Sequence, residues 1–142
     1  MDKQSLLELF KTIKTAFPQF VASAETADLW FRLLSGHDAA ILAEATDNFI
    51  KQSTYPPTIA DINLGAVAIE EEEAKIKRDV MNNWRSTASL QCLDDNVTKL
   101  YERAVFSQPR EKWRECGRYL EREVAAHDRE LAEDVIRRVA GL

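Results

Sequence analysis

The sequence predicts an all-α protein: a compact N-terminal four-helix bundle followed by long C-terminal amphipathic helices. Only four glycines and four prolines occur in 142 residues, fewer than the turns of a many-stranded fold would need. Apolar residues also recur at intervals of three and four through most of the chain, which is the helical period. Hydrophobic residues make up 45% of the chain, enough for a core. We expect an N-terminal helical domain over 1–65 and a C-terminal helical, partner-binding region over 66–142.

The first two helices have recognisable ends. Ser5 and Glu8 have the capping-box spacing, in which hydroxyl and carboxylate each accept a free backbone N–H, so a helix should begin at Ser5. Pro18 should end it, because the residue before a proline avoids helical geometry. A second helix is expected over 23–35, with Gly36 as its left-handed C-cap.

Two more short helices complete the expected bundle. Asp38 should cap a third helix, which ends before the turn Tyr55-Pro56-Pro57. Thr58 should cap a short fourth helix ending near Gly65. The connections of about two to six residues are typical of neighbouring packed helices. The core of the bundle is expected to contain Phe17, Trp30, Leu34 and Ile62.

A long helix should begin at Ala66. Its first turns would hold the glutamates 70–73, where the helix dipole favours negative charge, so we interpret this run as a solvated helix start rather than a metal patch. The polar stretch 85–93 is expected to be a loop. Further helices should begin at Asp94 or Asp95 and at Ser107-Gln108-Pro109, with a break near 126–128 and a stop at Gly141, and the last stripe should run through Trp113, Leu120, Val124, Leu131 and Val135.

The charge distribution argues against a general nucleic-acid surface. Residues 1–74 carry five Lys/Arg against twelve Asp/Glu, a balance of −7, whereas residues 75–142 carry fourteen against twelve, a balance of +2. Phosphate neutralisation needs a local excess of cations, so direct nucleic-acid binding is disfavoured. Cys92 and Cys116 lack a CxxC spacing, and no secretory signal or membrane span is recognisable. A cytoplasmic location without membrane association is therefore expected.

Groups that could do chemistry are few. His37 and His127 are the only histidines, and both are expected to be solvated, without a second ligand at helical metal-site spacing. Glycine-rich phosphate loops and nucleophile elbows are absent. We therefore predict a protein that is not an enzyme and has no cofactor or metal. The arginines between 110 and 122 alternate with glutamates, which indicates intrahelical pairs rather than a DNA-reading helix. A DNA-binding regulator or initiator accessory protein remains the alternative function.

The first half resembles a known family. The stretch 9–20 with its Phe17-Pro18 stop, then Trp30 in a helix, then Tyr55-Pro56-Pro57-Thr58 before another helix, together resemble the phage-type replicative (DnaB-type) helicase loader/inhibitor family. The resemblance covers about residues 5–65. It implies a non-enzymatic adaptor that binds the hexameric replicative helicase, inhibits or loads it in phage or prophage replication, and hands it to an origin-bound initiator complex.

The resemblance also implies that the C-terminal part engages the helicase. Tryptophan and arginine most often dominate interface energies because they bury large areas and can also pair. We therefore predict a partner-binding set in the second half, while burial of Trp113 and Leu120 inside the protein is the alternative for those two. The predicted set is Trp113, Arg114, Tyr119 and Leu120.

Overall fold

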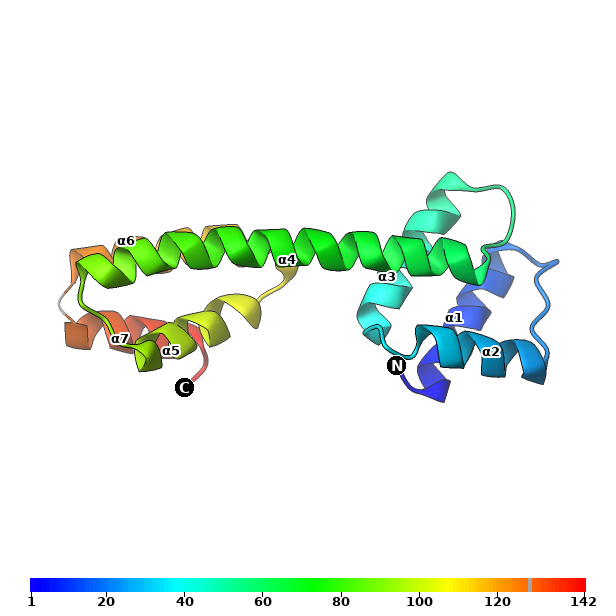
Figure 1. The fold of residues 1–142 in the computed structure, drawn as a ribbon, viewed down its shortest axis with the longest axis horizontal. Coiled ribbons are helices and arrows are strands. Elements are labelled where there is room, and N and C mark those ends of the chain that lie inside the picture. The colour runs from blue at the N-terminus through cyan, green and yellow to red at the C-terminus, as the bar shows by residue number, and fades with distance from the viewer. Residues whose placement is uncertain (128) are drawn as a thin grey trace. The chain divides into compact units, whose positions relative to one another are not determined.

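The computed structural model describes residues 1–127 and 129–142. Every regular element in these ranges is helical, so the all-α prediction is confirmed. None of the described helices is both long enough and apolar enough to cross a lipid bilayer. The elements (Figure 1) are α1 (Lys3–Ala16), α2 (Ala24–Leu34), α3 (Ala39–Gln52), α4 (Ile59–Leu90), α5 (Asp95–Phe106), a 3₁₀ turn η1 (Arg110–Lys112), α6 (Trp113–Ala126) and α7 (Arg129–Val139).

The chain divides into two compact units. Unit 1 is Met1–Glu72 and unit 2 is Glu73–Leu142. The division falls within α4, seven residues after the border expected from the sequence. Each unit has its own hydrophobic core.

Unit 1 consists of α1, α2, α3 and the first part of α4, and its helix starts are set by side-chain caps. The caps of α2, α3 and α4 are those predicted: Ser23, Asp38 and Thr58 each accept a backbone N–H of the following turn. The expected start of α1 at Ser5 is wrong. Asp2 is the cap, and its carboxylate accepts the Ser5 N–H at 2.7 Å. An acidic N-cap satisfies the same backbone donors as a serine, which is why the helix begins two residues earlier.

Aromatic rings fill the centre of the unit 1 core. The Phe10 and Trp30 rings meet edge to face with centroids 5.2 Å apart, and Phe20 packs on both. Edge-to-face pairs of this kind contribute about 1 kcal/mol beyond their area burial. The four residues predicted for this core, Phe17, Trp30, Leu34 and Ile62, are all buried.

The expected break at Gly65 is wrong, because α4 is one helix of 32 residues. A Cβ at Gly65 would lie 3.1 Å from the Ala45 Cβ, so the glycine allows α3 to approach α4 closely and does not make a turn. The glutamates 70–73 consequently lie inside the helix and not in its first turns. Gly36 also differs from expectation, since its backbone is not left-handed.

The loop expected over 85–93 is helical as far as Leu90. Trp84 and Ala88, one turn apart, are both buried in the unit 2 core, and this packing outweighs the weak local pattern. The chain then turns through Cys92, a non-glycine residue with a φ of 53°. Asp94 caps α5 as predicted.

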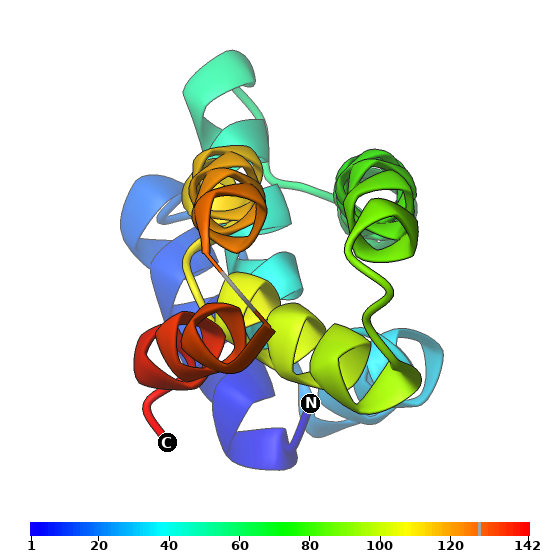
Figure 2. The same cartoon turned by 90° about the vertical axis from the view of Figure 1, so that its left-hand side faces the viewer.

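Unit 2 is assembled around a stacked pair of rings. Trp84 and Tyr101 lie 4.1 Å apart at an interplanar angle of 12°, and the Trp84 indole N–H donates to the Thr98 hydroxyl at 2.9 Å. The second half of α4 and α6 run side by side, with α5 and α7 on one side of them (Figure 2). A Cβ at Gly117 would lie 2.7 Å from the Tyr101 hydroxyl, so glycine is needed where α6 crosses this ring.

The last two helices largely follow the predicted pattern. The predicted break falls between Ala126, where α6 ends, and the start of α7, although Asp128 itself lies outside the described residues. Leu131 is predicted on the apolar stripe but is 52% exposed, and α7 instead buries Ala132 and Ile136. Gly141 has a φ of 78° and ends the last helical turn as expected.

Candidate partner-binding surface

Helix α6 has one buried face and one exposed face. The buried residues follow spacings of four, three and four, the period of a helix packed on one side. They are Trp113, Gly117, Leu120 and Val124. The exposed residues on and just before the helix include three cations, two glutamates and an aromatic ring, and they are Glu111, Lys112, Glu115, Arg118, Tyr119 and Arg122.

Two of the four predicted interface residues lie in the core. Leu120 is fully buried and Trp113 is 6% exposed. The Trp113 indole N–H donates to the Gln108 carbonyl at 2.8 Å, and its ring meets Phe106 edge to face. The Lys77 ammonium covers both rings at 5.2 and 5.4 Å from their centroids. For Trp113 and Leu120 the structure therefore supports burial, and they stabilise the surface from beneath.

The other two predicted residues, Arg114 and Tyr119, reach solvent. Tyr119 is 43% exposed. Arg114 pairs with Asp79 of α4 at 3.1 Å, and nearby Arg110 pairs with Glu73 of α4 at 3.0 Å. The sequence pattern indicates pairing along one helix, whereas these two arginines reach carboxylates of another. Both pairs tie the start of α6 to α4.

Tyr119 lines a hollow between α6 and α7. The hollow has a volume of about 280 Å³, and its wall combines aliphatic, aromatic and charged groups. Pockets of this size, with an apolar lining and a few polar groups, suit one or two side chains of a partner. The lining residues are Gln108, Lys112, Glu115, Cys116, Tyr119, Arg122 and Val139.

A second, shallower hollow of 490 Å³ adjoins it on α6 and shares Glu115 and Arg122. Its other lining residues are Arg118, Glu121 and Ala125. Glu121 is half-buried and accepts the Tyr101 hydroxyl at 3.2 Å. Burial raises the pKa of Glu121, while that hydrogen bond and Arg118 oppose the rise. We call the two hollows and the residues lining them the α6 surface. Sequence reasoning identifies Lys112, Arg118 and Arg122 only as half of an alternating charge pattern.

The α6 surface has no reactive thiol among its described residues. Burial raises the pKa of the Cys116 thiol, and Glu115 raises it further. A raised thiol pKa lowers the fraction of nucleophilic thiolate. Groups of three or more histidine, cysteine or carboxylate side chains that could hold a metal are absent from residues 1–127 and 129–142. The surface therefore offers shape, apolar area and charge.

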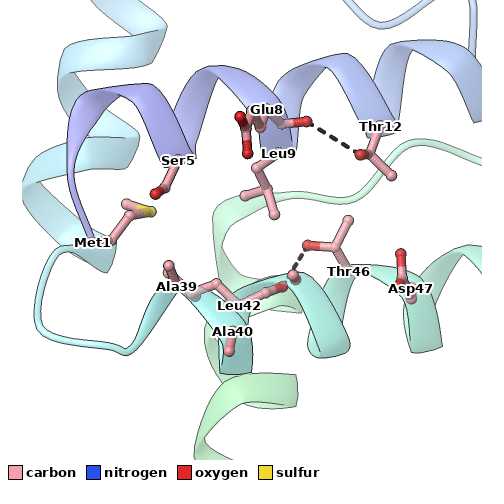
Figure 3. A pocket seen from close by; sticks show the side chains of 11 residues that line it. Met1, Ser5, Glu8, Leu9, Thr12, Ala39, Ala40, Leu42, Thr46 and Asp47 are labelled. Atoms are coloured by element: carbon pink, nitrogen blue, oxygen red, sulfur yellow. Dashed lines mark hydrogen bonds between the residues drawn. The ribbon is translucent and has the colours of Figure 1, made fainter.

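Unit 1 also contains a hollow, between α1 and α3, with a volume of 300 Å³ (Figure 3). The Thr12 and Thr46 hydroxyls beside it each donate to a carbonyl of their own helix, at 3.1 and 2.8 Å. Small alanines of α3 face α1 across it, and the carboxylates of Glu8 and Asp47 lie at its edge.

His37, which the sequence predicts as solvated, is held inside unit 1. Its side chain is 15% exposed, and its two ring nitrogens contact the Glu70 carboxylate and, at 2.8 Å, the Asn63 side-chain oxygen. The hydrogen bond to Glu70 is the main cause of a raised His37 pKa. His127 is exposed, as expected, and pairs with Glu123 one turn earlier. The buried histidine connects the loop before α3 to α4, which is a structural role.

Comparison with known proteins gives one informative result. Neither the curated proteins nor the solved structures contain a match to this chain. Residues 1–63, which cover α1 to α3 and the start of α4, match the family model for the N-terminal domain of the phage gene 39 protein. That protein is the helicase loader of phage SPP1, and the match supports placing this part of the chain in a phage helicase-loader family.

Proposed function

We propose that this chain is a non-enzymatic adaptor that binds a hexameric replicative helicase of the DnaB type. The match of residues 1–63 to the helicase-loader domain carries the proposal. The order of the punctuation, Phe17-Pro18, Trp30 and Tyr55-Pro56-Pro57-Thr58, supports it as well. In the proposed role the protein restrains the helicase and delivers it to an origin-bound initiator during phage or prophage replication.

The α6 surface is the helicase-binding surface in this proposal. Tyrosine and arginine are enriched among residues that dominate binding energy, and here Tyr119 and Arg122 line one hollow. Arg118 lies in the adjoining hollow, so a partner covering both would meet apolar area and cations together. The Arg114–Asp79 and Arg110–Glu73 pairs fix α6 on α4 before binding, which lowers the entropy lost on association.

The direct test is complex formation between the full chain and the replicative helicase of its host or phage. We expect a complex at micromolar concentration with nucleotide present, measured by calorimetry or size-exclusion chromatography with light scattering. We also expect lower ATP hydrolysis by the helicase when the protein is bound. Absence of a complex with the cognate helicase would remove the proposal.

Two variants locate the surface. Tyr119→Ser and Arg122→Glu should each weaken helicase binding by about tenfold or more, as expected for central interface residues. Leu90→Ser is the matched control for the apolar change, because Leu90 is 84% exposed at the end of α4. Lys99→Glu, on the exposed part of α5, is the control for charge reversal. If all four variants bind equally well, helicase binding uses another face.

The alternative function, direct DNA binding, is separated by the same variants. Phosphate binders lose affinity steeply as salt rises, because counterions are released. We expect little DNA retention at physiological salt, given the balance of −7 over residues 1–74. Strong retention that Arg122→Glu abolishes would favour the DNA-binding regulator.

A further inference from the structure

A groove in unit 1 is chemically unlike the rest of that unit. It lies between α1 and the segment that follows it, and has a volume of 410 Å³. Leu7 and Val21 line it and are 56% and 77% exposed, although both are large apolar side chains. The complete lining is Leu7, Phe10, Lys11, Lys14, Thr15, Phe20, Val21 and Ala22, all of them described residues.

The floor of the groove is rigid. Phe10 is 7% exposed, and its ring packs on Trp30 and on Phe20, which itself packs on Trp30. The Lys14 ammonium donates to the Phe20 carbonyl at 3.1 Å and so fixes the segment after α1 against the helix. A preformed apolar floor binds a side chain without an entropy cost for ordering itself.

The charge of the groove is opposite to that of its surroundings. Residues 1–72 carry five Lys/Arg against eleven Asp/Glu, yet the groove lining includes Lys11 and Lys14 and, among its eight described residues, no carboxylate. The two lysines lie three residues apart, so they are neighbours on one side of α1. An approaching acidic group is attracted at this groove and repelled by the net charge of the rest of unit 1.

We propose that this groove is a docking site for a short acidic segment of a partner protein that carries large apolar side chains. Apolar side chains of the segment lie on Phe10 and Phe20 between Leu7 and Val21, and its carboxylates pair with Lys11 and Lys14. From Leu7 to Lys14 the groove follows α1 for about 10 Å at the helical rise, so it accommodates two turns of a helix or a few extended residues. The site is separate from the α6 surface and does not depend on the proposed helicase contact.

Three synthetic peptides of about 12 residues test the proposal, two to three helical turns being enough to cover the groove. One is an amphipathic peptide with Glu on one face and Leu on the other. The second replaces each Glu with Lys, and the third replaces each Leu with Ser. Each is titrated into the isotopically labelled full chain, with amide chemical shifts as the readout. We expect saturable shifts for the acidic leucine peptide only, centred on residues 7–22 and weakened by added salt.

Variants then identify the contacts. Lys11→Glu and Leu7→Ser should each weaken binding of the acidic peptide by about tenfold, since one removes the charge attraction and the other apolar area. Lys51→Glu on α3 and Leu64→Ser, at a position 68% exposed on α4, are matched controls expected to bind as the wild type does. Equal binding of the basic peptide, shifts outside residues 7–22, or unchanged affinity of Lys11→Glu would each overturn the proposal. A complete absence of binding would overturn it as well.

Discussion

Replacing Gly117 with alanine would place a methyl group where α6 has no room for one. The added Cβ would lie 2.7 Å from the Tyr101 hydroxyl oxygen and 3.2 Å from a methyl carbon of Val80. Real Cβ contacts below 3.0 Å are essentially unknown, so the Tyr101 ring or α6 has to move. The ring is fully buried and stacked on Trp84 at 4.1 Å, so movement in either direction disturbs the unit 2 core.

The expected loss of stability follows from two opposing effects. Overpacking a well-packed core costs about 1–3 kcal/mol. Alanine is better than glycine inside a helix by about 1 kcal/mol, which offsets part of this cost. The net destabilisation of unit 2 is therefore about 1 kcal/mol and at most about 2 kcal/mol. For a folding unit of this size, 1 kcal/mol lowers Tm by about 4–8 °C.

Hydrogen exchange with mass spectrometry measures the effect unit by unit. Peptides from α5 and α6 should exchange faster in Gly117→Ala, and peptides from residues 1–63 should be unchanged. Gly36→Ala is the matched control, because a Cβ there meets nothing within 4 Å and its backbone is not left-handed.

Tyr101→Phe decides whether the hydroxyl causes the conflict. Alone it removes the hydrogen bond to Glu121, at a cost of about 1 kcal/mol. Combined with Gly117→Ala it should cost less than the sum of the two single changes, because the closest contact has gone. A stable Gly117→Ala protein, or a strictly additive pair, would show that the close approach to Tyr101 does not limit this position.

Three further predictions concern other positions. Gly65→Ala should destabilise unit 1 by about 1 kcal/mol, measured by urea denaturation, because its Cβ would lie 3.1 Å from α3, and an unchanged midpoint would contradict this. His37 has a pKa raised above its ordinary 6.5, so its pairing with Glu70 should stabilise unit 1 fully below about pH 6.5 and fade as pH rises through the folded pKa. The gap in unfolding free energy between wild type and His37→Gln should therefore be about 1 kcal/mol at low pH, after allowing for solvent at the exposed side of Glu70, and should shrink with rising pH. Cys92 is exposed whereas Cys116 has a raised pKa, so a thiol reagent should label Cys92 about tenfold faster in the folded protein, and equal rates would refute the assigned burial.

Local chemistry in the sequence predicts most helix starts. Ser23, Asp38, Thr58 and Asp94 are recognisable as caps because each precedes an apolar-periodic run, and this signal is contained in a few adjacent residues. Asp2 escapes the same reasoning because Ser5 and Glu8 supply a competing cap pattern three residues later.

The continuity of α4 cannot be predicted locally. Gly65 has the same appearance in sequence whether it ends a helix or allows a neighbouring helix to approach, and only the position of α3 distinguishes the two. The polar stretch after Trp84 is helical because Ala88 packs into a core built from distant residues. The burial of His37 is hidden for the same reason, since its partner Glu70 lies 33 residues away in sequence.

The candidate surface can be predicted only in part. The second half of the chain stands out for its mixture of large apolar and charged residues, and Arg114 and Tyr119 do reach solvent. The spacing that joins Trp113, Leu120 and Val124 on one face is present in the sequence, and it separates core from surface better than residue type does. The hollow between α6 and α7 needs the structure, because Val139 contributes to it from another helix.

The three tryptophans are distributed so that light emission can report on each half of the molecule independently. Trp30 lies in the core of unit 1, and Trp84 and Trp113 lie in that of unit 2. A Trp30→Phe protein would fluoresce from unit 2 alone, and a Trp84→Phe/Trp113→Phe protein from unit 1 alone. Recording the red shift of each during denaturation would reveal whether the halves melt in one transition or two. The same pair of proteins, mixed with a candidate partner, would show which half that partner protects.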